Sequence, residues 1–248
     1  MTQRFNLYKY SSPASFYPLA GRAIPVFAAL AAILCAAGLW VGFFVAPTDA
    51  QQGEGYRIIF LHVPTSWMSM FIYLVMAFWS AIGLAFNTRL SGMMAAALAP
   101  TGAMFAALSL ITGSFWGKPM WGTWWVWDAR LTSELILLFL YLGYLGLHAA
   151  IDDPRRADKA CAVLALVGAV NVPIIYFSVQ WWNTLHQGAS VSVTRSPSMA
   201  HTMLIGMLLM ALAAWMYSIA VALSRARAII LEREQRTDWV GELKEVTA

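Results

Sequence analysis

Tryptophan is concentrated in one short segment of the sequence, between residues 116 and 130. The segment contains five tryptophans, two glycines and one carboxylate, Asp128. Indole rings offer a rigid apolar surface on which a flat macrocycle can lie, and each ring pair adds about 0.5–1.5 kcal/mol beyond the burial of area. Tryptophan also lines membrane interfaces, but such a belt spreads over several helix ends. We therefore interpret the segment as a ligand platform made by Trp116, Trp121, Trp124, Trp125, Trp127 and Asp128, although Asp128 can equally cap the helix that follows.

Histidine placement gives a second indication of chemistry. Two of the four histidines, His62 and His186, are expected near the tryptophan segment. His62 precedes an apolar run in which Pro64 can occupy the first helical turn. Axial ligation of haem iron requires imidazole nitrogen on one or both faces of the ring. We therefore predict that His62 and His186 ligate haem iron, whereas His148 is structural and His201 is a reserve candidate.

The cations near these segments suit the two propionates of haem. Arginine forms bidentate pairs with carboxylates, and the predicted outer face carries only Arg57, Lys118, Arg130 and Arg195. We expect propionate partners among Arg57, Lys118 and Arg130. Ordinary solvation is the alternative for each, and Arg130 can also pair with Glu134 four residues later on the helix surface.

The elements that position these residues are predicted to be membrane-spanning helices. Of 248 residues, 60% are hydrophobic and 11% are charged, and the mean hydropathy is +0.64. A helix needs about 20 apolar residues to cross a hydrocarbon core of about 30 Å. The chain is therefore predicted to be an all-α polytopic membrane protein with a short tryptophan-rich periplasmic loop between helices 3 and 4. Its six expected spans are Ile24 to Phe44, Pro64 to Phe86, Met93 to Phe115, Leu131 to Ala149, Cys161 to Trp181 and Met199 to Leu223.

Charge distribution predicts the orientation of these spans. The side that holds both termini carries 12 of the 16 lysines and arginines, and the other side carries four. Lysine and arginine accumulate in cytoplasmic loops, so both termini are predicted to be cytoplasmic and the candidate site periplasmic. Residues 1–223 are expected to form one transmembrane domain, and residues 224–248 a cytoplasmic tail. Because topology accounts for the net charge of +4, lipid contact is expected and a nucleic-acid partner is not.

Two classes of chemistry are not expected. Cys35 and Cys161 lie at different membrane depths and no CxxC or CxxCH motif is present, so neither disulfide exchange nor covalent haem attachment is predicted. The segment from Gly113 to Pro119 superficially resembles a phosphate-binding loop, but its spacing is wrong and no Ser or Thr follows Lys118. We predict a haem-binding transfer platform rather than an enzyme, with ATP hydrolysis on another subunit.

These segments resemble those of a known family. The stretch from Trp116 to Leu135 is similar to the WWD signature of haem-handling membrane proteins. The stretches Leu61 to Pro64 and Trp181 to Gly188 narrow the resemblance to the cytochrome c maturation protein C family, also called haem exporter protein C or CcmC. The resemblance covers roughly Ala46 to Ser198.

The resemblance implies a six-span bacterial inner-membrane component of the CcmABCD complex. It implies that His62 and His186 are axial ligands of haem b, iron protoporphyrin IX. It also implies that the loop from Trp116 to Asp128 binds haem and presents it to the periplasmic haem chaperone CcmE. The ATPase CcmA and the membrane subunit CcmB are implied for release of the loaded chaperone, with the small protein CcmD associated. The structure and role of Ala189 to Ala200 are not dictated by the sequence.

Other functions remain open from the residues alone. The permease subunit of an ABC transporter that exports haem or another substrate would suit six spans beside an ATPase. It needs a polar path, and the expected spans contain Asn171 but no central run of ionisable groups. A b-type electron carrier would need histidines deep within paired spans. A WWD-type synthetase that joins haem to apocytochrome would have further spans and histidines.

Overall fold

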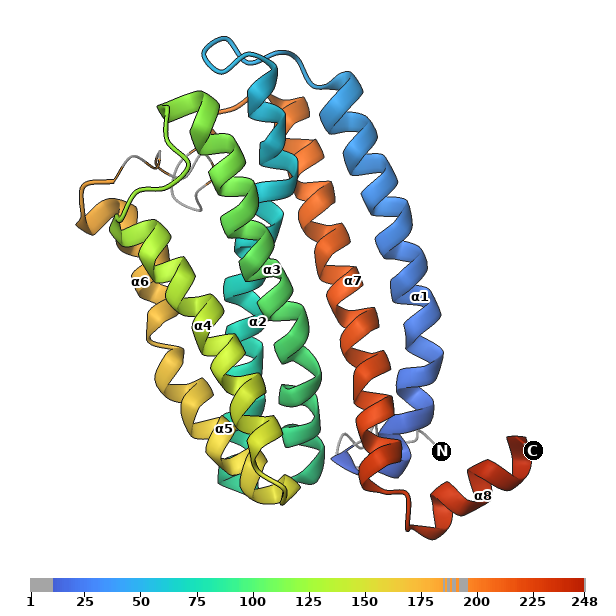
Figure 1. Ribbon diagram of the computed structural model, residues 1–248. Coiled ribbons are helices and arrows are strands. Elements are labelled where there is room, and N and C mark those ends of the chain that lie inside the picture. The colour runs from blue at the N-terminus through green and yellow to red at the C-terminus, as the bar shows by residue number, and fades with distance from the viewer. Residues whose placement is uncertain (1–10, 185, 187, 189–190, 192–195, 248) are drawn as a thin grey trace.

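The computed structural model describes residues 11–184, 186, 188, 191 and 196–247, and it confirms an all-α membrane architecture. Six helical segments are long and apolar enough to cross a membrane. They form one elongated bundle, in which α1 begins and α7 ends at the lower end of Figure 1. The elements are α1 (Pro13–Trp40), η2 (Val41–Val45), η3 (Glu54–Ile58), α2 (Ile59–Phe86), α3 (Arg89–Trp121), α4 (Ala129–Ala150), α5 (Pro154–Gly168), α6 (Asn171–Trp181), α7 (His201–Arg233) and α8 (Asp238–Thr247).

The core lies among α2, α3, α4 and α5, while α1 packs mainly along α7 (Figure 1). Tyr73 and Tyr141 are fully buried at its centre, with ring centroids 4.9 Å apart in an edge-to-face arrangement. The Tyr141 hydroxyl donates to the Ser69 carbonyl at 2.7 Å, which satisfies a polar group that lipid could not. The central four helices therefore form a specific scaffold for the loops above them.

The fifth predicted span is two helices rather than one. α5 ends at Gly168 and α6 begins at Asn171, so the chain breaks just before Pro173. Proline has no N–H to donate to the carbonyl four residues earlier, and its ring crowds that carbonyl. The Asn171 amide donates to the Ser133 carbonyl at 2.9 Å and ties the break to α4. This polar residue thus has a structural partner in the bundle.

Several expected helix ends are wrong. α1 begins at Pro13 rather than Ile24, and α5 begins at Pro154 rather than Cys161. α3 runs to Trp121 rather than Phe115, so the first part of the predicted tryptophan loop is helical.

Two further helix ends also differ from the prediction. α7 continues beyond Leu223 to Arg233, because Ala226 and Ile230 extend its buried face against α3. α2 begins at Ile59, so Pro64 lies inside the helix rather than in its first turn. The preceding 3₁₀ turn starts the helix early, and the Pro64 ring then leaves one helical hydrogen bond unmade.

Two helix ends shape the tryptophan loop. α3 stops at Gly122, whose φ of 78° is left-handed and whose N–H donates to the Lys118 carbonyl at 3.1 Å. Glycine adopts this conformation without steric cost. α4 starts after Asp128, whose carboxylate accepts the Leu131 N–H at 2.8 Å. The predicted capping role of Asp128 is confirmed, and the loop is fixed at both ends.

Candidate functional site: a histidine and tryptophan pocket

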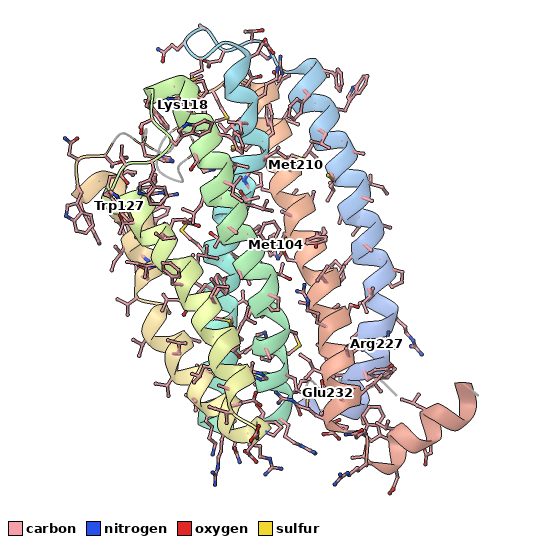
Figure 2. All side chains as sticks on the ribbon, in the orientation of Figure 1. Met104, Lys118, Trp127, Met210, Arg227 and Glu232 are labelled. Atoms are coloured by element: carbon pink, nitrogen blue, oxygen red, sulfur yellow. The ribbon has the colours of Figure 1, made fainter. Side chains whose placement is uncertain are left out.

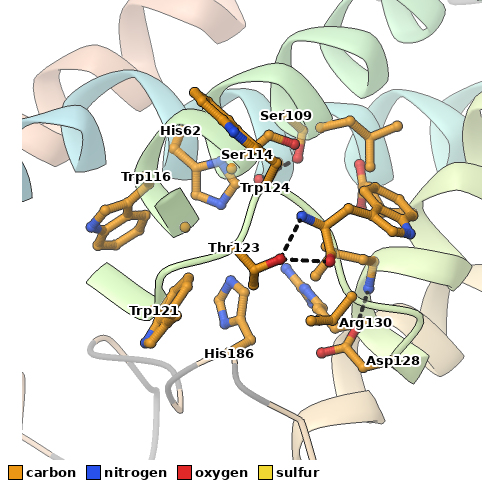
Figure 3. Close-up of a pocket in the computed structure, with 18 residues that line it drawn as sticks. His62, Ser109, Ser114, Trp116, Trp121, Thr123, Trp124, Asp128, Arg130 and His186 are labelled. Atoms are coloured by element: carbon orange, nitrogen blue, oxygen red, sulfur yellow. Dashed lines mark hydrogen bonds between the residues drawn. The ribbon is translucent and has the colours of Figure 1, made fainter. Parts of the chain in front are cut away.

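A pocket lies at the upper end of the bundle between α2, α3, α4 and the tryptophan loop (Figure 3). The space among its lining atoms measures about 640 Å³, including the part that is open to the surroundings. We call it the upper pocket. The predicted site residues that line it are His62, Trp116, Trp121, Trp124, Trp125, Asp128, Arg130 and His186.

Four aromatic rings are grouped on one side of the upper pocket. The ring centroids of His62 and His186 are 6.2 Å apart. Trp116 lies 5.6 Å from His62, Trp121 lies 6.3 Å from His186, and the two indoles are 6.2 Å apart. Figure 3 shows the four rings as a quadrilateral. Residues from α2, α3 and the segment after α6 therefore come together, as the sequence predicted.

His62 is held inside the bundle rather than at its mouth. Its side chain is 93% buried, and a Cβ added at Gly113 would lie 3.0 Å from its Cε1. The Thr112 hydroxyl donates to the Leu108 carbonyl at 2.6 Å, so its oxygen can accept from His62 Nδ1 at 3.1 Å. That arrangement favours the tautomer with the proton on Nδ1. Nε2 is then the nitrogen with a free electron pair.

Neighbouring residues position His186 and the tryptophan loop. The His186 backbone N–H donates to Thr184 Oγ1 at 2.8 Å. The Thr123 hydroxyl donates to the Trp125 carbonyl at 2.9 Å and accepts the Trp125 N–H at 3.3 Å, which folds the loop tightly. This fold directs Trp125 toward the upper pocket. Trp127 is 78% exposed and does not line the pocket.

The three cations considered for propionate binding have different surroundings. Arg130 lines the upper pocket and donates to the Ile175 carbonyl at 2.7 Å. Lys118 donates to the Gly122 carbonyl at 3.1 Å and lies outside the lining, at the upper end of Figure 2. Arg57 pairs with Glu54 and donates to the carbonyls of Gly42 and Ala46 at 2.5 and 3.2 Å. Of the three, Arg130 is the one that the structure places in the pocket.

Glu134 is a pocket residue that the sequence placed wrongly. The ion pair between Arg130 and Glu134, which the sequence allowed on the helix surface, is not formed, although both residues are described by the structure. Glu134 is 4% exposed, and its Oε1 accepts from Ser69 at 2.8 Å. Ser66 and Ser109 share a hydrogen bond of 2.6 Å and also line the pocket. A carboxylate within an apolar run was the available signal, since such residues are costly in a membrane.

Three buried polar atoms that border the upper pocket have no hydrogen-bond partner. They are Trp125 Nε1, Asp128 Oδ2 and Glu134 Oε2. An unsatisfied buried polar group costs about 1–3 kcal/mol. The residues of this largely aromatic pocket therefore include one hydrogen-bond donor and two acceptors that no group of the described chain satisfies.

Together, the bundle and the upper pocket define a polytopic membrane protein with an aromatic pocket near one end of its helices. The family model described as heme exporter protein C matches residues 6–241. The chain is 46% identical over 241 residues to heme exporter protein C of Escherichia coli K12, covering 96% of both chains. It is 48% identical over 231 residues to the Bradyrhizobium diazoefficiens protein of that name, covering 93% of this chain and 88% of the relative. The chain belongs to the heme exporter protein C family.

Proposed function

We propose that this protein binds haem b in the upper pocket and presents it for transfer to the chaperone CcmE during c-type cytochrome biogenesis. The spacing of His62 and His186 carries the proposal. An imidazole nitrogen lies about 2.0 Å from a transition metal, so two axial imidazoles have ring centroids roughly 6 Å apart. The observed 6.2 Å fits one iron between the rings.

The remaining ligands favour a macrocycle over a bare metal ion. Among the described residues, no group of three histidine, cysteine or acidic side chains gathers to hold a metal. Two imidazoles leave four equatorial positions, and a porphyrin supplies four nitrogens. Trp116 and Trp121 lie beside the two histidines and offer apolar faces to such a ring.

The polar groups of the upper pocket suit the propionates. Arg130 is the pocket cation, and the unpartnered Trp125 Nε1–H is a buried donor. Charge-assisted hydrogen bonds from arginine to a carboxylate are about twice as strong as neutral ones. Arg130 and Trp125 would orient the carboxylate edge, while Arg57 and Lys118 remain weaker candidates because they lie outside the pocket lining.

The proposed orientation places the upper pocket in the periplasm and both termini in the cytoplasm, across the bacterial inner membrane. It rests on the concentration of lysine and arginine at the lower end. CcmE would then dock on the tryptophan loop, where Trp124 and Trp127 are 52% and 78% exposed. CcmA, CcmB and CcmD would complete the complex, with CcmA supplying ATP hydrolysis.

The test is an absorption spectrum of the full-length protein, purified in detergent after co-expression with CcmE. His62→Gly and His186→Gly should each lose six-coordinate haem, and added imidazole should restore the spectrum by entering the vacated position. His201→Gly is the control, because this exposed histidine lies outside the pocket lining. Wild-type spectra in both glycine variants would refute the ligand assignment and favour a permease. A wild-type protein that carries no haem would refute haem binding itself.

A further inference from the structure

A second cavity lies at the lower end of the bundle, far along the helices from the upper pocket. It is lined by the end of α2, the start of α3, the first half of α5 and the end of α7. The space measures about 1270 Å³ and opens to the surroundings. We call it the lower hollow. It shares no lining residue with the upper pocket, so its function is a separate question.

The charges around the lower hollow leave two cations without partners. Its lining carries four cations and three carboxylates. Arg89 pairs with Glu234 at 2.8 Å, and Arg233 pairs with Asp158 at 2.6 Å. The third carboxylate, on Asp153, accepts the Arg156 backbone N–H and caps α5. The unpaired cations are Arg155 and Lys159, which are exposed and have no ion-pair partner among the described residues.

Arg155 and Lys159 also lie on one face of one helix. They are four residues apart on α5, so their side chains are neighbours on its surface. Both border the same cavity, beside the positive N-terminal end of α5. Two adjacent cations at a helix start form an electrostatic site for a phosphate group.

The buried hydroxyl of Ser80 indicates that the same cavity binds a polar ligand. Ser80 lines the hollow and is 2% exposed, and its Oγ has no hydrogen-bond partner. Leaving a buried donor unsatisfied is unfavourable. A ligand with a phosphate or glycerol oxygen would satisfy it.

Part of the lining of the lower hollow is apolar. Leu84, Met93, Ala95 and Ala162 contribute to its lining. Leu84 is also 38% exposed, and Phe86 just beyond it is 73% exposed, on helices that cross the membrane. A ligand that occupies the hollow would therefore contact both cations and apolar side chains.

We propose that the lower hollow binds the headgroup of an anionic phospholipid. The phosphate lies at Arg155 and Lys159, the Ser80 hydroxyl donates to a headgroup oxygen, and an acyl chain leaves past Leu84. Basic pockets between transmembrane helices bind such headgroups on the cytoplasmic side of membranes. This assignment does not depend on haem binding. It uses only the membrane location of the bundle and the contacts of its lower end.

The experiment compares thermal unfolding of the full-length protein in two kinds of nanodisc, pure phosphatidylcholine and phosphatidylcholine with phosphatidylglycerol. Ligands that bind the folded state raise its unfolding temperature. Phosphatidylglycerol should therefore stabilise the wild type. The double variant Arg155→Gln with Lys159→Gln should unfold at the same temperature in both nanodiscs. Each cation changes the affinity for an anionic headgroup about fivefold, so the loss of two lowers it roughly 25-fold. Arg156→Gln with Arg236→Gln is the matched control, because both residues are exposed at the same end but outside the hollow.

Ser80→Ala gives a test with opposite signs in the two membranes. Phosphatidylcholine carries no net charge, so the proposal expects it to leave the hollow empty. In this lipid the variant should then unfold at a higher temperature than the wild type, because an unsatisfied hydroxyl has been removed. With phosphatidylglycerol present, its gain from the lipid should be smaller than that of the wild type. Equal loss of stabilisation in the control pair would overturn the proposal by showing general surface attraction. Equal stabilisation by inorganic phosphate in phosphatidylcholine would overturn the lipid assignment in favour of a free anion.

Discussion

The two ends of the bundle differ in how far their buried polar groups are paired. At the lower end, the side chains of Arg233, Asp158 and His148 are in mutual contact, and Arg89 pairs with Glu234. At the upper end, Asp128 and Glu134 are buried with one oxygen each unpartnered, beside the unpartnered Trp125 Nε1. Three of the five such atoms in the described part of the chain line this one pocket. The comparison teaches that the buried charges of the lower end satisfy one another, whereas those of the upper end keep oxygens that no group of the described chain binds.

The largest expected effect is on stability, at the lower end. Arg233→Ala would leave Asp158 without its main partner, and both side chains are less than one fifth exposed. Breaking such a pair costs about 3 kcal/mol or more. We expect a clearly lower unfolding temperature in detergent, with an unchanged haem spectrum. Arg236→Ala, at an exposed position, should change neither; a haem spectrum altered in Arg233→Ala alone would break the separation between the two ends.

The next effect is on binding, at the upper end. Thr112→Val removes the acceptor for His62 Nδ1 while keeping nearly the same shape. Loss of a hydrogen bond to a metal-bound histidine typically costs about 10–100-fold in affinity. We expect haem affinity to fall within that range in a haem titration, with little change in unfolding temperature. Thr112→Ser keeps the hydroxyl and should bind like the wild type, and equal affinity in the valine variant would show that Thr112 does not set the tautomer.

The smallest effect separates two roles of one residue. Asp128 caps α4 through Oδ1, while its Oδ2 is unpartnered. Asparagine caps helices as well as aspartate does, whereas alanine costs about 1 kcal/mol. Asp128→Ala should therefore lower the unfolding temperature by a few degrees, and Asp128→Asn should not. If Asp128→Asn nevertheless changes haem affinity, the free oxygen acts on the ligand; identical unfolding of all three proteins would contradict the capping role.

The sequence predicted the parts of this molecule that depend on local patterns. Apolar runs of membrane length located all six spans, and Asp128 before an apolar run indicated its helix start. It did not predict the break before Pro173 as a division of the fifth span, nor the extension of α7. The extension of α7 depends on packing against α3, which the residues of one helix do not encode by themselves. For the break, Pro173 was an available local signal.

The candidate site was predictable in its membership but not in its arrangement. His62, His186 and four of the five tryptophans of the segment do line one pocket, but Trp116 and Trp121 lie on α3 rather than in the predicted loop. Trp127 faces outward because the turn at Gly122 and Thr123 sets the direction of each ring. The burial of Glu134 depends on Ser69 from another helix. Side-chain direction in a loop and contacts between distant helices require the folded chain.

The hydrogen bonds of Arg57 have a mechanical consequence. Arg57 precedes α2 and donates to the carbonyls of Gly42 and Ala46, which lie in and just after the π-helical turn that ends the first span. His62 follows five residues later, on α2. Arg57 therefore connects the end of the first span to the start of the helix that carries His62. Phe60 fills the space beside Gly42, so the same junction is also closely packed. Much of the first span faces outward, with Ile33 on α1 65% and Phe44 on η2 74% exposed. If His62 ligates iron as proposed, a displacement of that outer face would reach the ligand through the contacts of Arg57 and Phe60, and the first span would act on the site as well as anchor the protein in the membrane.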